Sequence, residues 1–265
     1  MSNERNGDAT NTDRLQPVDG FSSTEHGVAR YGEKPTVTSV KDYLEFLKMR
    51  RSRTLWFRGH RDNTWERLPS AFRSEVDRKK ESEYIARFRQ QAAQEGVRYG
   101  LDDWGWLTLA QHHGVPTRLL DWSESPLVGL YFAVEEDSSM RSSDGEVLLL
   151  DPYALNEDAG DPPGVLRLLT DSEKVLAPFY PGPNTSGQRT RAVLAPMAFE
   201  RIRHQTGMFT VSTLGKNDLE DTPAIEALEI PAAAKSEIRF ELECLGVNEA
   251  SIYRDLDRIA KKIKE

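Results

Sequence analysis

Arg58 is the first side chain in the sequence whose setting suggests chemistry. It follows the apolar run Leu55–Phe57 and precedes Gly59, which lets the backbone approach a partner closely. A guanidinium in this setting suits a phosphate or a carboxylate, because its planar fork binds such groups through two parallel hydrogen bonds. The alternative is a structural ion pair with Asp121 or another acid, since a buried charge needs a partner whatever its function.

A second segment, residues 114–133, places Asp121, Trp122 and Ser123 between apolar runs. Polar groups in such surroundings are either hydrogen-bonded within the fold or presented to a ligand. Asp121 is therefore a candidate catalytic carboxylate. It is equally a candidate cap for a helix that begins near Ser125, because Asp and Ser are preferred at helix starts.

Two histidines, His112 and His113, precede this segment and could act as a base, a ligand or a capped core residue. His113 with Asp121 would suit a nuclease or hydrolase that needs no metal. Their spacing matches no zinc signature, so we expect no metal site. Farther along the chain, Gln205 either presents its amide to a ligand or ends a short helix for which Gly207 is the stop signal.

The composition narrows the classes of function. The 265 residues carry a formal charge of -8, which argues against passive binding to nucleic acid but leaves a local basic site open. No apolar run approaches 18 residues, and the N-terminus lacks the pattern of a signal peptide, so we expect no membrane association. A single cysteine, Cys244, excludes a disulfide framework. The cytoplasm is the expected compartment.

The order of the elements predicts an α+β fold, with a mixed and mostly antiparallel sheet core flanked by helices. Residues 1–30 are polar and are expected to form a disordered tail, and residues 31–265 a single domain. Helices are expected from Ser39, over Glu81–Gln94, Trp104–His112, from Pro126, and over Ala198–His204, Ala233–Gly246 and Ala250–Lys264. Strands are expected over Thr54–Gly59, Thr117–Asp121, Glu146–Leu150, Arg191–Leu194, Met208–Thr213 and Ala224–Ile230. Residues 160–187 are rich in Pro and Gly and are expected to be irregular.

Three motifs together resemble the FRG domain family. They are Phe57-Arg58-Gly59, the run from His113 to Ser123 with Pro126 and Phe132-Ala133 after it, and Gln205 to Thr210. The resemblance covers roughly residues 38–264. The order of the motifs is also similar to that of mono-ADP-ribosyltransferases, and this similarity implies an ADP-ribosyltransferase-like fold and NAD as the cofactor.

By this resemblance Arg58 would bind the pyrophosphate or ribose of NAD, Ser123 would support it, and Tyr131 or Phe132 would stack on a ring. Gln205 departs from the pattern, because the transferases carry a glutamate at that place. A neutral amide stabilises developing positive charge less well than a carboxylate. Asp121 is the candidate that supplies the missing charge.

The sequence thus yields three hypotheses of function. The first is an enzyme that binds NAD and transfers or cleaves its ADP-ribose, with Asp121, Gln205 and His113 as catalytic groups and a role as a toxin or in anti-phage defence. Its acceptor, a protein or a nucleic acid, is left open. The second is a non-catalytic recognition module in which Arg58, Asp121 and Gln205 form a buried polar network. The third and weaker one is the nuclease or hydrolase.

Overall fold

The computed structural model describes residues 34–95, 100–135, 143–182, 187–195, 207–213 and 218–253. By their mutual contacts residues 34–265 form one compact unit. The tail predicted for residues 1–30 and the helix predicted over Ala198–His204 lie outside the described residues.

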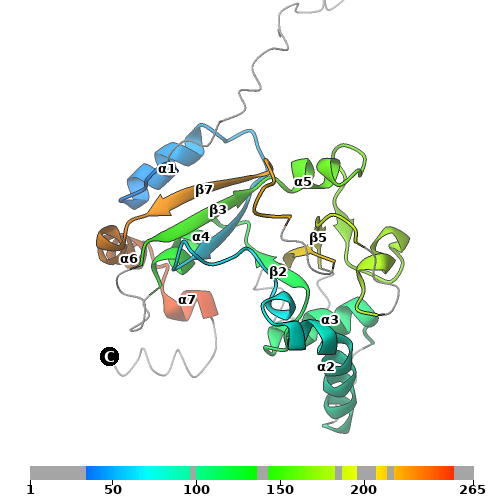
Figure 1. The fold of residues 1–265 in the computed structure, drawn as a ribbon. Helices are drawn as coiled ribbons and strands as arrows, with labels where there is room; N and C mark the ends of the chain where they lie inside the picture. The colour runs from blue at the N-terminus through cyan, green and yellow to red at the C-terminus, as the bar shows by residue number, and fades with distance from the viewer. Residues whose placement is uncertain are drawn as a thin grey trace, which may run out of the picture. The chain divides into compact units, whose positions relative to one another are not determined.

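The strands form two sheets, as Figure 1 shows. One sheet has three antiparallel strands in the order β1 (Trp56–His60), β3 (Gly145–Leu150), β7 (Ile225–Ile230). The other has the order β2 (Leu119–Trp122), β6 (Met208–Val211), β5 (Arg191–Leu194), β4 (Arg167–Leu168), and only its β4–β5 pair is parallel. The predicted α+β class with mostly antiparallel pairing is confirmed.

Helices flank both sheets. They are α1 (Val40–Lys48), α2 (Glu75–Gln94), α3 (Asp103–His112), α4 (Pro126–Val134), α5 (Pro152–Asp158), α6 (Lys235–Cys244) and α7 (Glu249–Tyr253). Short 3-10 turns cover Ser70–Phe72, Lys174–Phe179 and Ala232–Ala234. The predicted start of α1 is confirmed, because Ser39 Oγ accepts a hydrogen bond from the Asp42 backbone N–H.

One helix prediction was wrong in its start and one helix was missed, and capping explains both. Helix α2 begins at Glu75 and not at Glu81, because Ser74 accepts hydrogen bonds from two backbone N–H groups and starts the helix earlier. The sequence reading also missed α5, which Asp151 caps and which has Pro152 at its first position.

The buried helix α4 packs against β1 and β3 in Figure 1, and two glycines allow the close approach. A Cβ on Gly59 would overlap the backbone of Gly129 and Ala133, and a Cβ on Gly129 would lie 2.8 Å from Phe57 Cβ. The close partner of Gly59 is therefore a helix of the same domain. Tyr131 and Val134 of α4 join the hydrophobic core beneath this contact.

One pair of residues connects the two sheets. The backbone groups of Phe57 and Ser123 exchange two hydrogen bonds, of 2.7 and 2.8 Å. In a regular antiparallel ladder the next such pair would be Gly59 with Asp121. Instead, the Asp121 carbonyl accepts a hydrogen bond of 2.8 Å from Arg58 Nη1. The Arg58 side chain thus replaces the next backbone hydrogen-bonded pair, at the point where the two strands separate.

Candidate functional site

A cavity of about 580 Å³ opens where β1 and β2 separate. Its walls come from β1, β2, α4, α7 and the loop that follows β1. Its lining residues are two cations, Arg58 and Arg61; two carboxylates, Asp121 and Glu135; five aromatic residues, Phe57, Trp65, Trp122, Phe132 and Tyr253; three serines, Ser123, Ser125 and Ser251; and Gly59, Val128 and Ile252. The two segments that the sequence singled out therefore meet in one cavity.

The Arg58 guanidinium has protein partners at Nε and Nη1 but not, among the described residues, at Nη2. Its Nε donates to His60 Nε2 at 3.1 Å, and its Nη1 donates to the Asp121 carbonyl. No described residue accepts a hydrogen bond from Nη2 or forms an ion pair with the guanidinium, so the predicted structural ion pair with Asp121 is absent from this part of the chain. Burial lowers the pKa of Arg58 to about 10, against the opposing effect of the Asp121 charge.

Asp121 presents its carboxylate to the cavity. The side chain is exposed to solvent there, although protein surrounds the cavity on several sides. This enclosure raises the pKa of the carboxyl above its ordinary value, while Arg58 and a hydrogen bond of 2.7 Å from Gln111 Nε2 lower it. Asp121 lies on β2 and does not cap α4, whose N-cap is Ser125.

Ser123 joins the two sheets at the edge of the cavity. Its backbone pairs with Phe57, and its Oγ accepts a hydrogen bond of 3.1 Å from the Ser125 backbone N–H. Only 9% of the residue is exposed. Ser123 therefore fixes the geometry where β1 and β2 meet.

The part of the lining formed by α4, α7 and the loop after β1 is aromatic. The rings of Phe132 and Tyr253 meet edge to face with their centroids 6.0 Å apart. Glu135 accepts hydrogen bonds from the Tyr253 hydroxyl and, at 3.3 Å, from Arg61 Nη1. The Arg61 guanidinium lies 5.3 Å from the centroid of Trp65. These contacts connect α7 to the end of α4 and leave ring surfaces along the cavity.

Not every predicted site residue lies at the cavity. His113 caps the end of α3, is exposed, and packs on Phe88 with a centroid distance of 5.7 Å. The cavity lining includes Phe132 but not His113 or Tyr131, and Tyr131 is buried in the core. Gln205 lies outside the described residues.

Sequence reasoning missed several groups that the fold brings to the site. His60 could have been found, because it is two residues after Arg58 on the same strand and alternation places both on one face. Gln111, Glu135 and Tyr253 carried no such signal, because tertiary packing alone brings them to the site.

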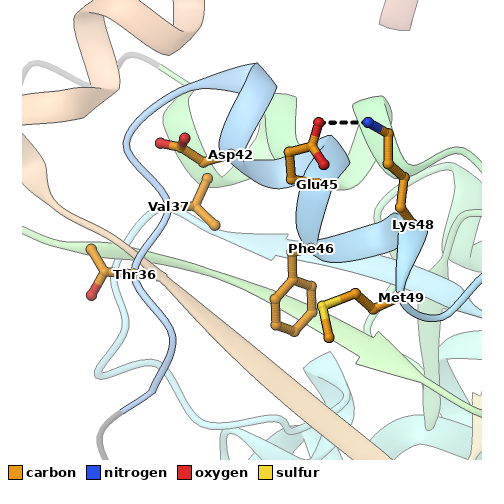
Figure 2. Close-up of a pocket in the computed structure, with 7 residues that line it drawn as sticks. All are labelled: Thr36, Val37, Asp42, Glu45, Phe46, Lys48 and Met49. Carbon is orange, nitrogen blue, oxygen red and sulfur yellow. Dashed lines mark hydrogen bonds and ion pairs between the residues drawn. The ribbon is translucent and has the colours of Figure 1, made fainter.

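Figure 2 shows a second hollow, beside α1. It is lined by Thr36, Val37, Asp42, Glu45, Phe46, Lys48 and Met49. Its charged groups are already engaged: Asp42 accepts hydrogen bonds from Thr38, and Lys48 pairs with Glu45. None of the predicted site residues lies there, so the cavity between β1 and β2 is the stronger candidate.

Two other features are absent from the described ranges. These residues contain no group of three or more His, Cys, Asp or Glu side chains arranged to hold a metal ion. Among them, no helix combines the length and the apolar character that crossing a membrane requires.

Fold and cavity together define an α+β protein with a polar, aromatic-lined pocket between two sheets. Comparison with protein families gives a more specific result: residues 53–142 match the family model of the FRG domain. This match supports the FRG assignment and spans β1, β2 and α4, which supply most of the cavity wall. Comparisons with curated proteins and with solved structures gave no match.

Proposed function

We propose that the cavity binds a nucleotide, NAD, and that the protein is an enzyme that cleaves or transfers the ADP-ribose of NAD. One observation carries the proposal: a guanidinium whose Nη2 no described residue engages and an accessible carboxylate line the same aromatic cavity. A nucleotide combines anionic phosphates, ribose hydroxyls and planar bases, and this lining offers a partner for each. The volume also lies within the range of about 300–1,000 Å³ that is usual for ligand sites.

Each cavity wall has a role in this proposal. Arg58 binds a phosphate through its open edge, because charge-assisted hydrogen bonds to phosphate are among the strongest that a side chain makes. Phe132 and Tyr253 offer ring surface to a base. Asp121 accepts a hydrogen bond from a ribose hydroxyl and stabilises the positive charge that develops on C1′ as the nicotinamide leaves.

The hydrolytic reaction balances without a metal. The bond between C1′ and the nicotinamide nitrogen breaks, and its electron pair returns to the ring. A water oxygen bonds to C1′, and Asp121 accepts the proton that the water loses. A raised pKa makes Asp121 a stronger base in this step. In the transfer reaction, a nucleophile of an acceptor protein or nucleic acid replaces water.

Thermal unfolding in the presence of ligand tests the binding. A ligand at about 100 times its Kd stabilises the folded state by about 2.7 kcal/mol, so NAD or ADP-ribose should raise the Tm by several degrees. Arg58→Met should strongly reduce the shift. Arg87→Met is the matched control, because Arg87 lies on the exposed face of α2 and its ion pair among the described residues is with Glu83. No shift at millimolar NAD in the wild-type protein would overturn the proposal.

Product analysis tests the chemistry separately. Proton NMR of a mixture of the protein and NAD should show free nicotinamide accumulating. Asp121→Asn should reduce the rate by about 100-fold or more, as expected for loss of a general base. If nicotinamide release also occurs during expression in a bacterial host, NAD should fall and growth should stop, which is the behaviour expected of a toxin or an anti-phage effector.

The recognition module remains the second candidate, and one observation favours it. Arg58, His60 and Glu146 form a chain of polar contacts through the interior, as a structural network would. On this alternative Arg58→Met should destabilise the fold strongly, and no nucleotide should bind. The outcomes expected for the NAD enzyme and those expected for the recognition module exclude each other.

A further inference from the structure

The polar chain behind Arg58 follows from strand register. Arg58 and His60 lie on the same face of β1, and Glu146 of β3 is directly opposite His60. Arg58 Nε lies 3.1 Å from His60 Nε2, and His60 Nδ1 lies 3.3 Å from Glu146 Oε1. Lys34 Nζ binds the other Glu146 oxygen at 2.8 Å. His60 and Glu146 are each 2% exposed.

This arrangement fixes the protonation state of the histidine. Arg58 always donates from Nε, so His60 Nε2 must be the acceptor and cannot carry a proton. The single proton of the neutral ring is then on Nδ1, which faces Glu146. The distance from Nδ1 to the carboxylate is slightly longer than a regular N–H···O hydrogen bond, so the two groups form a charge–dipole contact.

We propose that His60 is a positioning residue that aims the Arg58 guanidinium into the cavity, and that protonation of His60 releases it. The inference rests on the proposed function in one respect, that the anion held by Arg58 is the phosphate of a nucleotide. A protonated His60 can no longer accept from Arg58 Nε, and its positive charge repels the guanidinium. Anion binding is therefore coupled to a residue that lies outside the cavity lining.

Three charged groups act on His60 and set the pH at which it is protonated: Arg58 on β1, Arg67 in the following loop and Glu146 on β3. Glu146 in turn pairs with Lys34 and lies opposite Glu229 of β7. Burial lowers the pKa of His60, Glu146 raises it, and the two arginines lower it further. His60 is thus neutral at neutral pH, and the positioning contact is lost only as the solution becomes acidic.

Nitrogen NMR tests the positioning without any ligand. In the full-length protein at neutral pH, His60 should show the shifts of a ring protonated at Nδ1 alone. The Arg58 Nε signal should show a coupling across the hydrogen bond to His60 Nε2, and this coupling should disappear on acidification. A ring protonated at Nε2, or an Arg58 Nε signal that His60→Leu leaves unchanged, would overturn the inference.

Binding of ADP-ribose, measured by calorimetry, gives the functional readout. His60→Leu should weaken binding by about tenfold or more, because the guanidinium loses its orienting contact. His60→Gln, which can place an amide oxygen near the position of Nε2, should stay within about threefold of the wild-type Kd. Each variant is first checked for cooperative unfolding. His60→Leu binding with the wild-type Kd would contradict the inference.

A double variant separates positioning from a direct contact. If His60 acts through Arg58, then adding His60→Leu to Arg58→Met should weaken binding no further, whereas additive losses would contradict the inference. If the wild-type protein binds neither NAD nor ADP-ribose, the proposed function fails. The NMR experiment still decides whether His60 positions Arg58.

Discussion

Two arginines, Arg58 and Arg118, each lie within one of the first two motifs, and their surroundings differ in kind. Arg118, just before β2, is 3% exposed and uses Nε and Nη2 to bind the carboxylate of Glu81 on α2. Its Nη1 donates to the Phe179 carbonyl at 2.6 Å. Arg58 is also enclosed, but its partners are a histidine nitrogen and a backbone carbonyl, with no described carboxylate in an ion pair.

The difference separates an arginine that holds the fold together from one that is available to a ligand. In Arg118 the charge is compensated where it is buried, so removing either partner leaves an uncompensated charge. In Arg58 burial opposes the charge, and a bound anion would compensate it. The residue type is the same in the two cases, so the partners decide the role. Four variants test this contrast, from the largest expected effect to the smallest: Arg118→Ala, Gly59→Ala, Arg58→Met and Asp121→Asn.

The largest effect is expected for Arg118→Ala. It leaves Glu81 buried without a partner and should lower the free energy of unfolding by about 3–5 kcal/mol, as urea titration would measure. Replacing both residues, as in Arg118→Met with Glu81→Leu, should recover much of the loss. If the single variant is as stable as the wild-type protein, the structural role of Arg118 is wrong.

Gly59→Ala should have the next largest effect. The new methyl group would overlap the backbone of α4, and overpacking of this kind typically costs about 1–3 kcal/mol. Because α4 forms a wall of the cavity, ligand binding should weaken as well. Gly100→Ala is the control, since no atom lies within 4 Å of the added group, and it should leave both Tm and binding unchanged.

Arg58→Met should change stability by no more than about 1 kcal/mol. It removes two hydrogen bonds, each worth about 0.5–1.5 kcal/mol, but it also removes a cation whose pKa burial has lowered to about 10. A lowered pKa means that the charged form is less favourable in the folded state than in the unfolded one. A loss of 3 kcal/mol or more in urea titration would place Arg58 in the same class as Arg118.

The smallest effect is expected for Asp121→Asn, and its sign depends on pH. The pKa of Asp121 is raised by folding, so ionisation of this carboxyl destabilises the wild-type protein as the pH rises past its unfolded pKa. The variant should be more stable at neutral pH, by less than about 1 kcal/mol, because solvent in the cavity screens the charge. The difference in stability between the wild-type protein and the variant should vanish at acidic pH. There the Asp121 carboxyl is protonated and is neutral, like the Asn amide. Thermal unfolding across pH measures it, and a less stable variant at neutral pH would contradict the reasoning.

Much of the fold was predictable from local signals. The capped start of α1, Pro126 at the start of α4 and the apolar run of β3 each depend on a few neighbouring residues, and the structure has these elements where they were expected. The two sheets and the pair Phe57–Ser123 that connects them were not predictable, because strand pairing depends on contacts between distant residues. The early start of α2 was missed because its first turns are charged and show no apolar periodicity.

The candidate site was also predictable in part, because some of its residues carry local sequence signals and others come together only through tertiary packing. Arg58, Asp121, Ser123 and Phe132 were named from sequence, and all four line one cavity. His60, the partner of Arg58, was missed although alternation places it on the same strand face; only its direct contact with Arg58 depends on how the two side chains turn. His113 was named because it is near Asp121 in sequence, yet the end of α3 places it against Phe88 instead.

The interrupted ladder between β1 and β2 has a consequence for mutagenesis. Because the backbone groups of Phe57 point toward Ser123, alternation points those of Gly59 the same way, where no described residue accepts from its N–H. The main chain thus contributes a donor to the cavity edge that no side-chain substitution removes. Every variant of this pocket retains that donor, so affinity after the loss of Arg58 should fall to a baseline set by the peptide backbone.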